Sequence, residues 1–136
     1  MPSANSPQSL QKLLDSTPFL RLYGFRVHSA SRNSCTIRVP HRPTFERPDG
    51  IIGGPILITA ADVAMWLAIY TRLSLEERAV TVEMKTNFLR SLRKQPFLCR
   101  ARVVKLGRQL VYGTADCYAP GRGLLAHHTL TYIRLK

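Results

Sequence analysis

Residues 47–72, RPDGIIGGPILITAADVAMWLAIYTR, form the stretch that decides the fold of this chain. Between Ile56 and Tyr70 every residue is apolar or small except Thr59 and Asp62. A helix that lacks a polar stripe is buried on nearly all sides. The rest of the chain is therefore expected to wrap around a long central helix in this stretch.

The start of this helix is marked by Gly53-Gly54-Pro55. Glycine suits the cap, and proline is tolerated at the first helical position, where its missing N–H costs nothing. Asp62 then lies about two turns inside the helix. A carboxylate flanked by alanines is costly to bury unless it is paired, hydrogen-bonded or open to a cavity. Asp62 is the first candidate for a functional residue; the alternative is a structural carboxylate that bonds neighbouring backbone.

Several features favour a single cytoplasmic domain over residues 1–136. A membrane span needs roughly 20 uninterrupted apolar residues, and the central run is shorter and carries a carboxylate. The first residues lack the pattern of a secretory or transit signal. Cys35, Cys99 and Cys117 are odd in number and far apart, so neither a disulfide framework nor a zinc site is indicated. We therefore expect a reducing compartment and no metal.

The charge balance points to an anionic partner. The chain has 20 Lys and Arg against 8 Asp and Glu, which gives a net charge of +12. Nucleic acid, an anionic membrane surface and a phosphate-bearing small molecule all fit this charge. The basic residues are spread through the chain and form no dense run, which argues against a nucleic-acid-binding arm.

The remaining sequence predicts an α+β domain. Residues 1–7 are expected to be disordered, and leucines at helical spacing behind Ser9 predict a short helix over 9–16. Residues 19–27 are expected to lead as irregular chain into a first strand, and a turn at Asn33-Ser34 joins that strand to a second over 35–39 as a hairpin. Further strands are expected over 80–88, 97–106, 110–119 and 124–135. An antiparallel sheet curled around the single apolar helix is the economical packing. Such a sheet leaves an edge uncovered, which favours a dimer.

The strand over 80–88 alternates with a period of two. Strict alternation puts Val80, Val82, Met84, Thr86 and Phe88 on one face, and it puts Thr81 on the other face with Glu83, Lys85 and Asn87.

At this point the residues resemble a known family, the hotdog-fold thioesterases of the phenylacetate-pathway (PaaI-like) type, which are related to the 4-hydroxybenzoyl-CoA thioesterases. The resemblance covers about residues 18–135. The matching segments are GIIGG at 50–54, ADVA at 61–64, VTVEMKTNFLR at 80–90, ARVVKLGR at 101–108 and AHHTLTY at 126–132.

The resemblance implies a hotdog fold, in which two subunits join edge to edge, with a dimer of dimers as the larger assembly. It also implies an acyl-CoA thioesterase whose ligand binds at the dimer interface, without a cofactor or metal. Asp62 resembles the family's acidic residue, which acts as general base on water or as nucleophile. The Gly54 N–H resembles the donor that polarises the thioester carbonyl. Thr81 matches a hydroxyl that holds water, or it is simply a strand-forming threonine.

Three residues depart from the family pattern. Gly53 stands where a histidine is usual, Pro55 removes one backbone donor, and Arg47 stands where asparagine is frequent. Arg47 could bind the thioester oxygen or a phosphate, or pair with a neighbouring acid. Because of these changes, an alternative assignment stays open: a non-catalytic protein that binds acyl-CoA or another ligand.

Three further basic residues are candidates for binding the phosphates of CoA. Arg90, Lys105 and Arg108 are expected near the ends of neighbouring strands, where an ordinary solvated rim is the alternative.

Overall fold

The computed structural model describes residues 6–135. Its elements, in chain order, are α1 (Pro7–Asp15), the 3-10 helix η1 (Pro18–Leu22), β1 (Arg26–Ser31), β2 (Ser34–Val39), the 3-10 helix η2 (Pro43–Phe45), α2 (Gly54–Ile69), β3 (Arg78–Phe88), β4 (Phe97–Leu106), β5 (Leu110–Ala119) and β6 (Gly123–Leu135).

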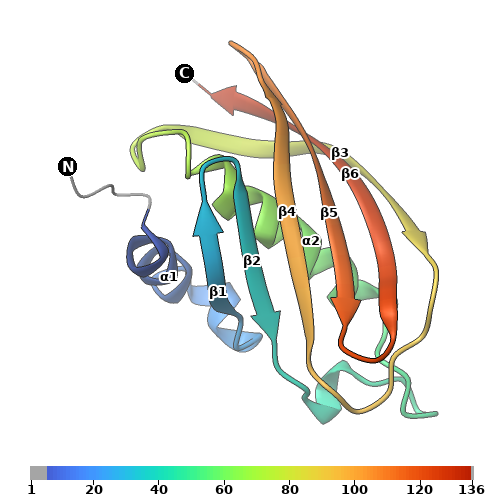
Figure 1. Ribbon diagram of the computed structural model, residues 1–136. Coiled ribbons are helices and arrows are strands. Elements are labelled where there is room, and N and C mark those ends of the chain that lie inside the picture. Colours follow the sequence, from blue (N-terminus) through green and yellow to red (C-terminus); the bar gives the residue numbers. More distant parts are fainter. Residues whose placement is uncertain (1–5, 136) are drawn as a thin grey trace.

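The strands form one antiparallel sheet around the central helix. Their order is β1-β2-β4-β5-β6-β3, and each neighbouring pair is antiparallel. The sheet curves around α2, as Figure 1 shows. The predicted α+β fold, with an antiparallel sheet wrapped around one long helix, is confirmed.

Helix α2 is buried against the sheet along most of its circumference. Its buried side chains include Ala60, Ala61, Ala64, Met65, Leu67 and Ala68. A stripe with the spacing of a helix face stays partly accessible, and it contains Ile58, Thr59, Asp62 and Trp66. The helix is therefore less enclosed than its apolar sequence predicts, and Asp62 lies on the open stripe.

Met65 of α2 packs directly over Gly113 of β5. A Cβ atom at this position would lie 2.1 Å from Cε of Met65 and 2.5 Å from the main-chain oxygen of Arg102. Only glycine leaves room for the methionine side chain over this strand.

Strand β3 contains a bulge that changes which side chains face the helix. Thr81 pairs with Tyr132 of β6, but Glu83 pairs with Thr131, so Val82 is the extra residue. The predicted strict alternation is therefore wrong at Thr81. The bulge turns Thr81 toward α2, where its hydroxyl contacts Asp62.

The N-terminal helix begins earlier than the sequence predicts. The hydroxyl of Ser6, not that of Ser9, caps the helix by accepting a hydrogen bond from the Ser9 N–H. Pro7 is the first helical residue, so residues 6 and 7 belong to the folded part. Residues 1–5, where disorder is also predicted, lie outside the described residues.

The two edges of the sheet differ. At one edge, α1 lies beside β1 (Figure 1), and the Gln11 side chain accepts a hydrogen bond from the Val27 N–H. At the other edge, β6 is the only strand among residues 6–135 that pairs with β3. Val80, Val82 and Phe88 of this edge strand are exposed apolar side chains. The β3 edge is therefore the part of the sheet most suited to pairing with another strand.

Candidate active site

Two hydroxyl groups bond the carboxylate of Asp62. Oδ1 accepts a hydrogen bond of 2.7 Å from Oγ1 of Thr81 and another of 2.7 Å from the phenolic oxygen of Tyr132. The Tyr132 hydroxyl also lies 2.8 Å from the main-chain oxygen of Asp62, so its single proton is shared between the two acceptors. Asp62 of α2, Thr81 of β3 and Tyr132 of β6 thus meet at one point.

Asp62 borders an open cleft of about 510 Å³. The polar groups of its wall are Asp62, Thr81, Tyr132, Thr59 and Thr17. The apolar part of the wall is formed by Phe19, Leu20, Tyr23, Ile58, Val63, Trp66, Ala79 and Val80. The volume is typical of a small-molecule site, and the few polar groups in an apolar wall are typical of one that orients its ligand.

The surroundings of Tyr132 favour the neutral phenol, which is a hydrogen-bond donor. Burial raises the pKa of its phenol, and the nearby Asp62 carboxylate raises it further. A neutral phenol has a proton to donate, so its bond to the carboxylate persists.

Gly54 lies at the first turn of α2 and cannot act on the same carbonyl group as Asp62 of the same chain. Its N–H is one that the helix leaves without an acceptor, and no other residue within 6–135 accepts from it. The eight positions from Gly54 to Asp62 span roughly 12 Å along a helix. Gly54 instead borders a separate hollow of about 340 Å³, together with Phe88 and Arg90.

Arg47 and Gly53 border a further hollow, of about 380 Å³, beside the start of α2. Tyr23 and Thr59 line both this hollow and the cleft of Asp62, so the two adjoin. Arg47 also borders the hollow of Gly54, and its guanidinium pairs with the carboxylate of Asp49 at 2.8 Å. Both side chains of this pair are well exposed, so the pair contributes little to stability.

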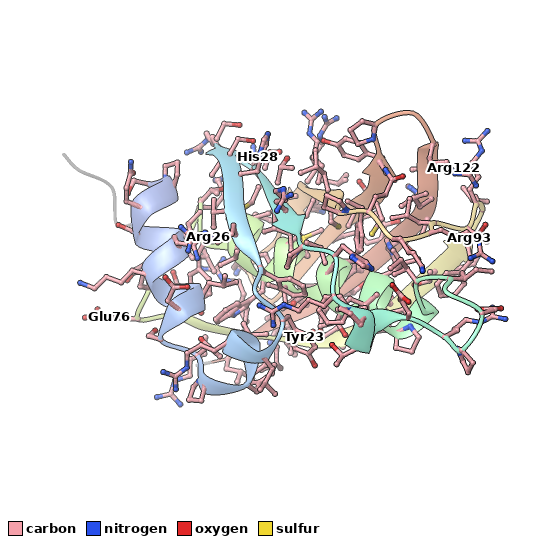
Figure 2. The ribbon with its side chains drawn as sticks, turned by 90° about the horizontal axis from the view of Figure 1, so that it is seen from below. Tyr23, Arg26, His28, Glu76, Arg93 and Arg122 are labelled. Atoms are coloured by element: carbon pink, nitrogen blue, oxygen red, sulfur yellow. The ribbon has the colours of Figure 1, made fainter. Side chains whose placement is uncertain are left out.

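The three predicted phosphate-binding residues lie at opposite ends of the sheet. Arg90 follows β3 and approaches the start of β6, with a nitrogen 3.5 Å from the Leu124 oxygen. Arg93 and Arg122 gather at this end of the molecule, as Figure 2 shows. Lys105 and Arg108 flank the turn between β4 and β5 at the other end, where Arg134 donates to the Gly107 oxygen. Within a single chain, Arg90 therefore lies far from Lys105 and Arg108.

Sequence reasoning missed Tyr132. The sequence signal that points to Tyr132 is the alternation of β6. This alternation places Tyr132 on the same face as the buried residues Ala126, His128 and Leu130. A tyrosine among buried residues needs a hydrogen-bond partner, but its pairing with Asp62 depends on the distance between α2 and β6 in the folded chain.

The structure offers no group of three His, Cys, Asp or Glu side chains able to hold a metal among residues 6–135. Within the same range, no helix has both the length and the apolar character to cross a bilayer.

Comparison with known proteins identifies the class. The sequence profile of the thioesterase superfamily matches residues 49–126, which is more than half of the chain, and the chain belongs to this superfamily.

Particular relatives agree with this assignment. A thioesterase family protein from Silicibacter pomeroyi is 28% identical, with a TM-score of 0.87 over 94% of this chain and 96% of that chain. The structure of a mutant of the phenylacetic acid degradation protein PaaI from Thermus thermophilus is 26% identical, with a TM-score of 0.78 over 87% of this chain and 99% of that chain. A Thermoplasma acidophilum protein, named provisionally as an esterase, is 29% identical over 77% of this chain and 79% of its own length. The resemblance to hotdog thioesterases is confirmed, and a thioester-hydrolase role for the chain is supported.

Proposed function

We propose that this protein hydrolyses acyl-CoA thioesters, with Asp62 as the residue that acts on the reacting group. The observation that supports the proposal is the environment of the Asp62 carboxylate. It is held by two hydroxyl groups at 2.7 Å and borders an open, largely apolar cleft of about 510 Å³. A carboxylate positioned in a partly dry cleft is suited to general-base or nucleophilic catalysis.

The proposed site is shared between two copies of the chain. A thioester carbonyl bonded to the Gly54 N–H cannot also meet Asp62 of the same α2, because the two are roughly 12 Å apart. Pairing of two β3 edges would bring a second α2 beside the first. In this arrangement Gly54 of one copy polarises the carbonyl, and Asp62 of the other copy acts on it. The homodimer is the smallest assembly with a complete site, and a dimer of dimers repeats it.

The reaction needs water and the groups named above. As a general base, Asp62 takes a proton from water, the water oxygen bonds to the carbonyl carbon, and the carbon–sulfur bond breaks. The thiolate of CoA leaves and takes up the proton that Asp62 received, and the free acid remains. As a nucleophile, Asp62 bonds to the carbonyl carbon while the carbon–sulfur bond breaks and the thiolate leaves; water then hydrolyses the mixed anhydride, which releases the free acid, restores the carboxylate and supplies the proton for the thiolate. Thr81 keeps acceptor capacity on its oxygen while donating to Asp62, so it can also hold the attacking water.

The cleft suits an acyl group, and the basic end of the molecule suits the phosphates of CoA. Arg47 and Arg90 border the hollow beside Gly54, and we assign them to phosphate or thioester contacts. Lys105 and Arg108 lie too far from Arg90 in one chain and serve the same ligand only if a second copy supplies them. Cys35, Cys99 and Cys117 are free thiols, which suits a reducing compartment such as the cytoplasm.

The test is release of free thiol from a panel of acyl-CoA esters. We expect turnover by the wild-type protein and a loss of about 100-fold or more in kcat for Asp62→Asn. Asp15→Asn is the matched control, because Asp15 is an exposed carboxylate of α1 that bonds only Gln11 within the described residues. The control is expected to keep full activity.

The replacement of the usual histidine by Gly53 favours one alternative, a protein that binds acyl-CoA without hydrolysing it. Isothermal titration calorimetry with the same esters separates the two. If the esters bind but none is hydrolysed faster than by Asp62→Asn, the binding protein is the correct assignment.

A further inference from the structure

The two oxygens of the Asp62 carboxylate have unequal surroundings. Oδ1 accepts from both Thr81 and Tyr132, whereas no described residue donates to Oδ2. Among residues 6–135, no fully buried side-chain nitrogen or oxygen lacks a hydrogen-bond partner. Oδ2 is therefore accessible, and the accessible space beside Asp62 is the cleft.

We propose that Tyr132 is a positioning residue, whose hydroxyl fixes Oδ1 of Asp62 together with Thr81 and so presents Oδ2 as the oxygen that reacts. This inference rests on the proposed function, because it assigns a role within the same site.

Tyr132 is the more rigid of the two donors. It belongs to β6, which is paired on both sides, by β5 and β3. Its side chain is 3% exposed. Thr81 lies on the edge strand next to the bulge and is exposed. A donor held in the sheet interior defines a position better than one on a free edge.

Tyr132 also fixes Asp62 at two points. Its hydroxyl lies within 2.8 Å of both the side-chain Oδ1 and the main-chain oxygen of Asp62. Rotation of the carboxylate away from the cleft would break the first of these contacts, and movement of the helix backbone would break the second. Oδ2 of Asp62 is thus held in one orientation, toward the cleft. A fixed orientation of the reacting atom is what a near-attack geometry requires.

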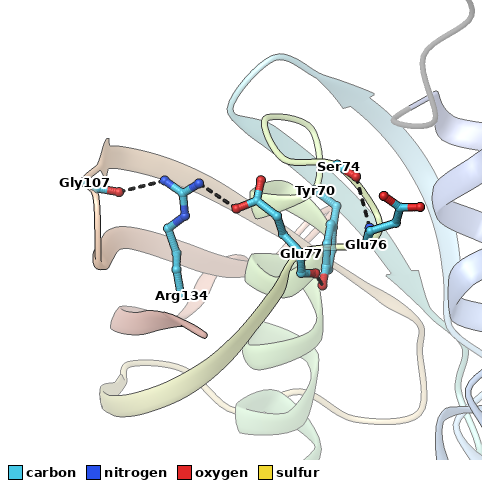
Figure 3. A network of polar contacts seen from close by, with 6 residues as sticks. All are labelled: Tyr70, Ser74, Glu76, Glu77, Gly107 and Arg134. Atoms are coloured by element: carbon cyan, nitrogen blue, oxygen red, sulfur yellow. Dashed lines mark hydrogen bonds and ion pairs between the residues drawn. The ribbon is translucent and has the colours of Figure 1, made fainter. Parts of the chain in front are cut away.

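The experiment compares Tyr132→Phe with Tyr70→Phe. Tyr70 is a matched control because it is also a buried tyrosine, at 5% exposure. Its hydroxyl donates to the main-chain oxygen of Glu77 at 2.6 Å, and Figure 3 shows this contact within a network that includes Arg134. Each substitution removes one hydroxyl and keeps the ring, so the two should cost similar amounts of stability.

We expect only Tyr132→Phe to change the chemistry. Its kcat for a CoA ester should fall about 10- to 100-fold, while KM changes less than about threefold. Tyr70→Phe should leave both kcat and KM as they are in the wild type.

A second readout does not depend on turnover. Carbon-13 NMR of the Asp62 carboxyl reports the hydrogen bonds that this group accepts, and at a fixed neutral pH its resonance should move in Tyr132→Phe but not in Tyr70→Phe. A moved resonance in a protein that hydrolyses no ester supports the contact of Tyr132 with the carboxyl and refutes the proposed function. An unmoved resonance, or equal kcat in the two variants while Asp62→Asn is inactive, overturns the role of Tyr132 and leaves the proposed function intact.

Discussion

At the scale of single residues, the buried polar groups of this molecule differ in their access to solvent. Asp62 is bonded by two hydroxyls and keeps one oxygen open to the cleft. Cys35, Cys99 and Cys117 have no accessible surface. Cys99 and Cys117 are directly opposite one another on β4 and β5. The first environment suits chemistry. Burial raises the pKa of the Cys35 and Cys99 thiols and so keeps them protonated, whereas hydrogen bonds with Cys99 and with His128, the latter at 3.5 Å, lower the pKa of the Cys117 thiol.

Burial of Cys35 makes the stability of the fold fall at alkaline pH. Burial raises the pKa of this thiol from 9.0 to about 12. Above pH 9 the unfolded chain releases the proton and the native chain keeps it, so the free energy of unfolding decreases until the pH passes about 12. The contribution of this thiol is fully present below pH 9. Its slope is at most about 1.4 kcal/mol per pH unit.

Urea unfolding of the wild type and of Cys35→Ala across this pH range measures the effect. The substitution is expected to lower stability at neutral pH by removing buried volume, but its stability should fall less steeply above pH 9. Parallel pH dependences for the two proteins would rule out Cys35 as the source.

At the scale of elements, the helix and the sheet are matched in shape at Gly113. Met65 of α2 occupies the space above this glycine, and the main-chain oxygen of Arg102 on β4 lies close beside it. The methionine is flexible and can move, but the strand backbone cannot do so without disturbing the sheet.

Gly113→Ala should therefore destabilise the fold by about 1–3 kcal/mol through overpacking. Gly53→Ala is the control, because a Cβ there would meet its nearest atoms at ordinary distances of 3.5 and 3.6 Å, and it should change stability by less than about 1 kcal/mol. Thermal or urea unfolding measures both. A Gly113→Ala protein as stable as the wild type would show that α2 is not fixed against β5 at this point.

The elements themselves could be predicted from the sequence because each has a local signal. The apolar run from Ile56 predicts α2, and the period of two predicts β3 to β6. The bulge at Val82 has no such signal, because an extra residue is defined only by the pairing of β3 with β6. The prediction that Thr81 shares a face with Glu83, Lys85 and Asn87 is wrong for this reason.

The candidate site was predictable only in part. Asp62 stands out in the sequence because it is a charge within an apolar helix. Tyr132 does not stand out, because a tyrosine in a strand is ordinary, and its contact with Asp62 joins residues 70 positions apart. Likewise, the separation of Arg90 from Lys105 and Arg108 follows from the direction of the strands and not from their spacing in sequence.

At the scale of the whole molecule, the uncovered edge is expected to determine assembly. Strand β3 has 11 residues, and in the part of the chain that the structure describes it pairs on one side only. Long, exposed apolar edges favour pairing with a second strand. In the proposed dimer, this edge joins two copies and completes two sites, so assembly and activity depend on the same surface.

The variant Val82→Arg tests whether activity depends on pairing at the β3 edge, and Val104→Arg is its control. Both valines are bulge residues with similar exposure, 54% and 58%. Val82 lies on the edge strand, whereas Val104 lies on β4 between two neighbours. A charge on the edge should oppose strand pairing. Val82→Arg is expected to sediment as a single chain and to lose at least about 10-fold in activity, because Gly54 of the second copy is absent.

Val104→Arg should keep both the dimer and its activity, and analytical ultracentrifugation with the thiol-release assay measures both properties. A Val82→Arg protein that remains dimeric would place the interface elsewhere on the molecule.

The extra residue in β3 also determines how this chemistry can change without loss of the fold. Beyond the bulge, residues 83–88 pair with β6 in unbroken register. Deleting Val82 is expected to rotate the preceding segment relative to β6, and so to turn Thr81 outward together with the buried Ala79. A change of one residue in strand length can therefore add or remove the hydroxyl beside the acid, and it disturbs only one small side chain of the core.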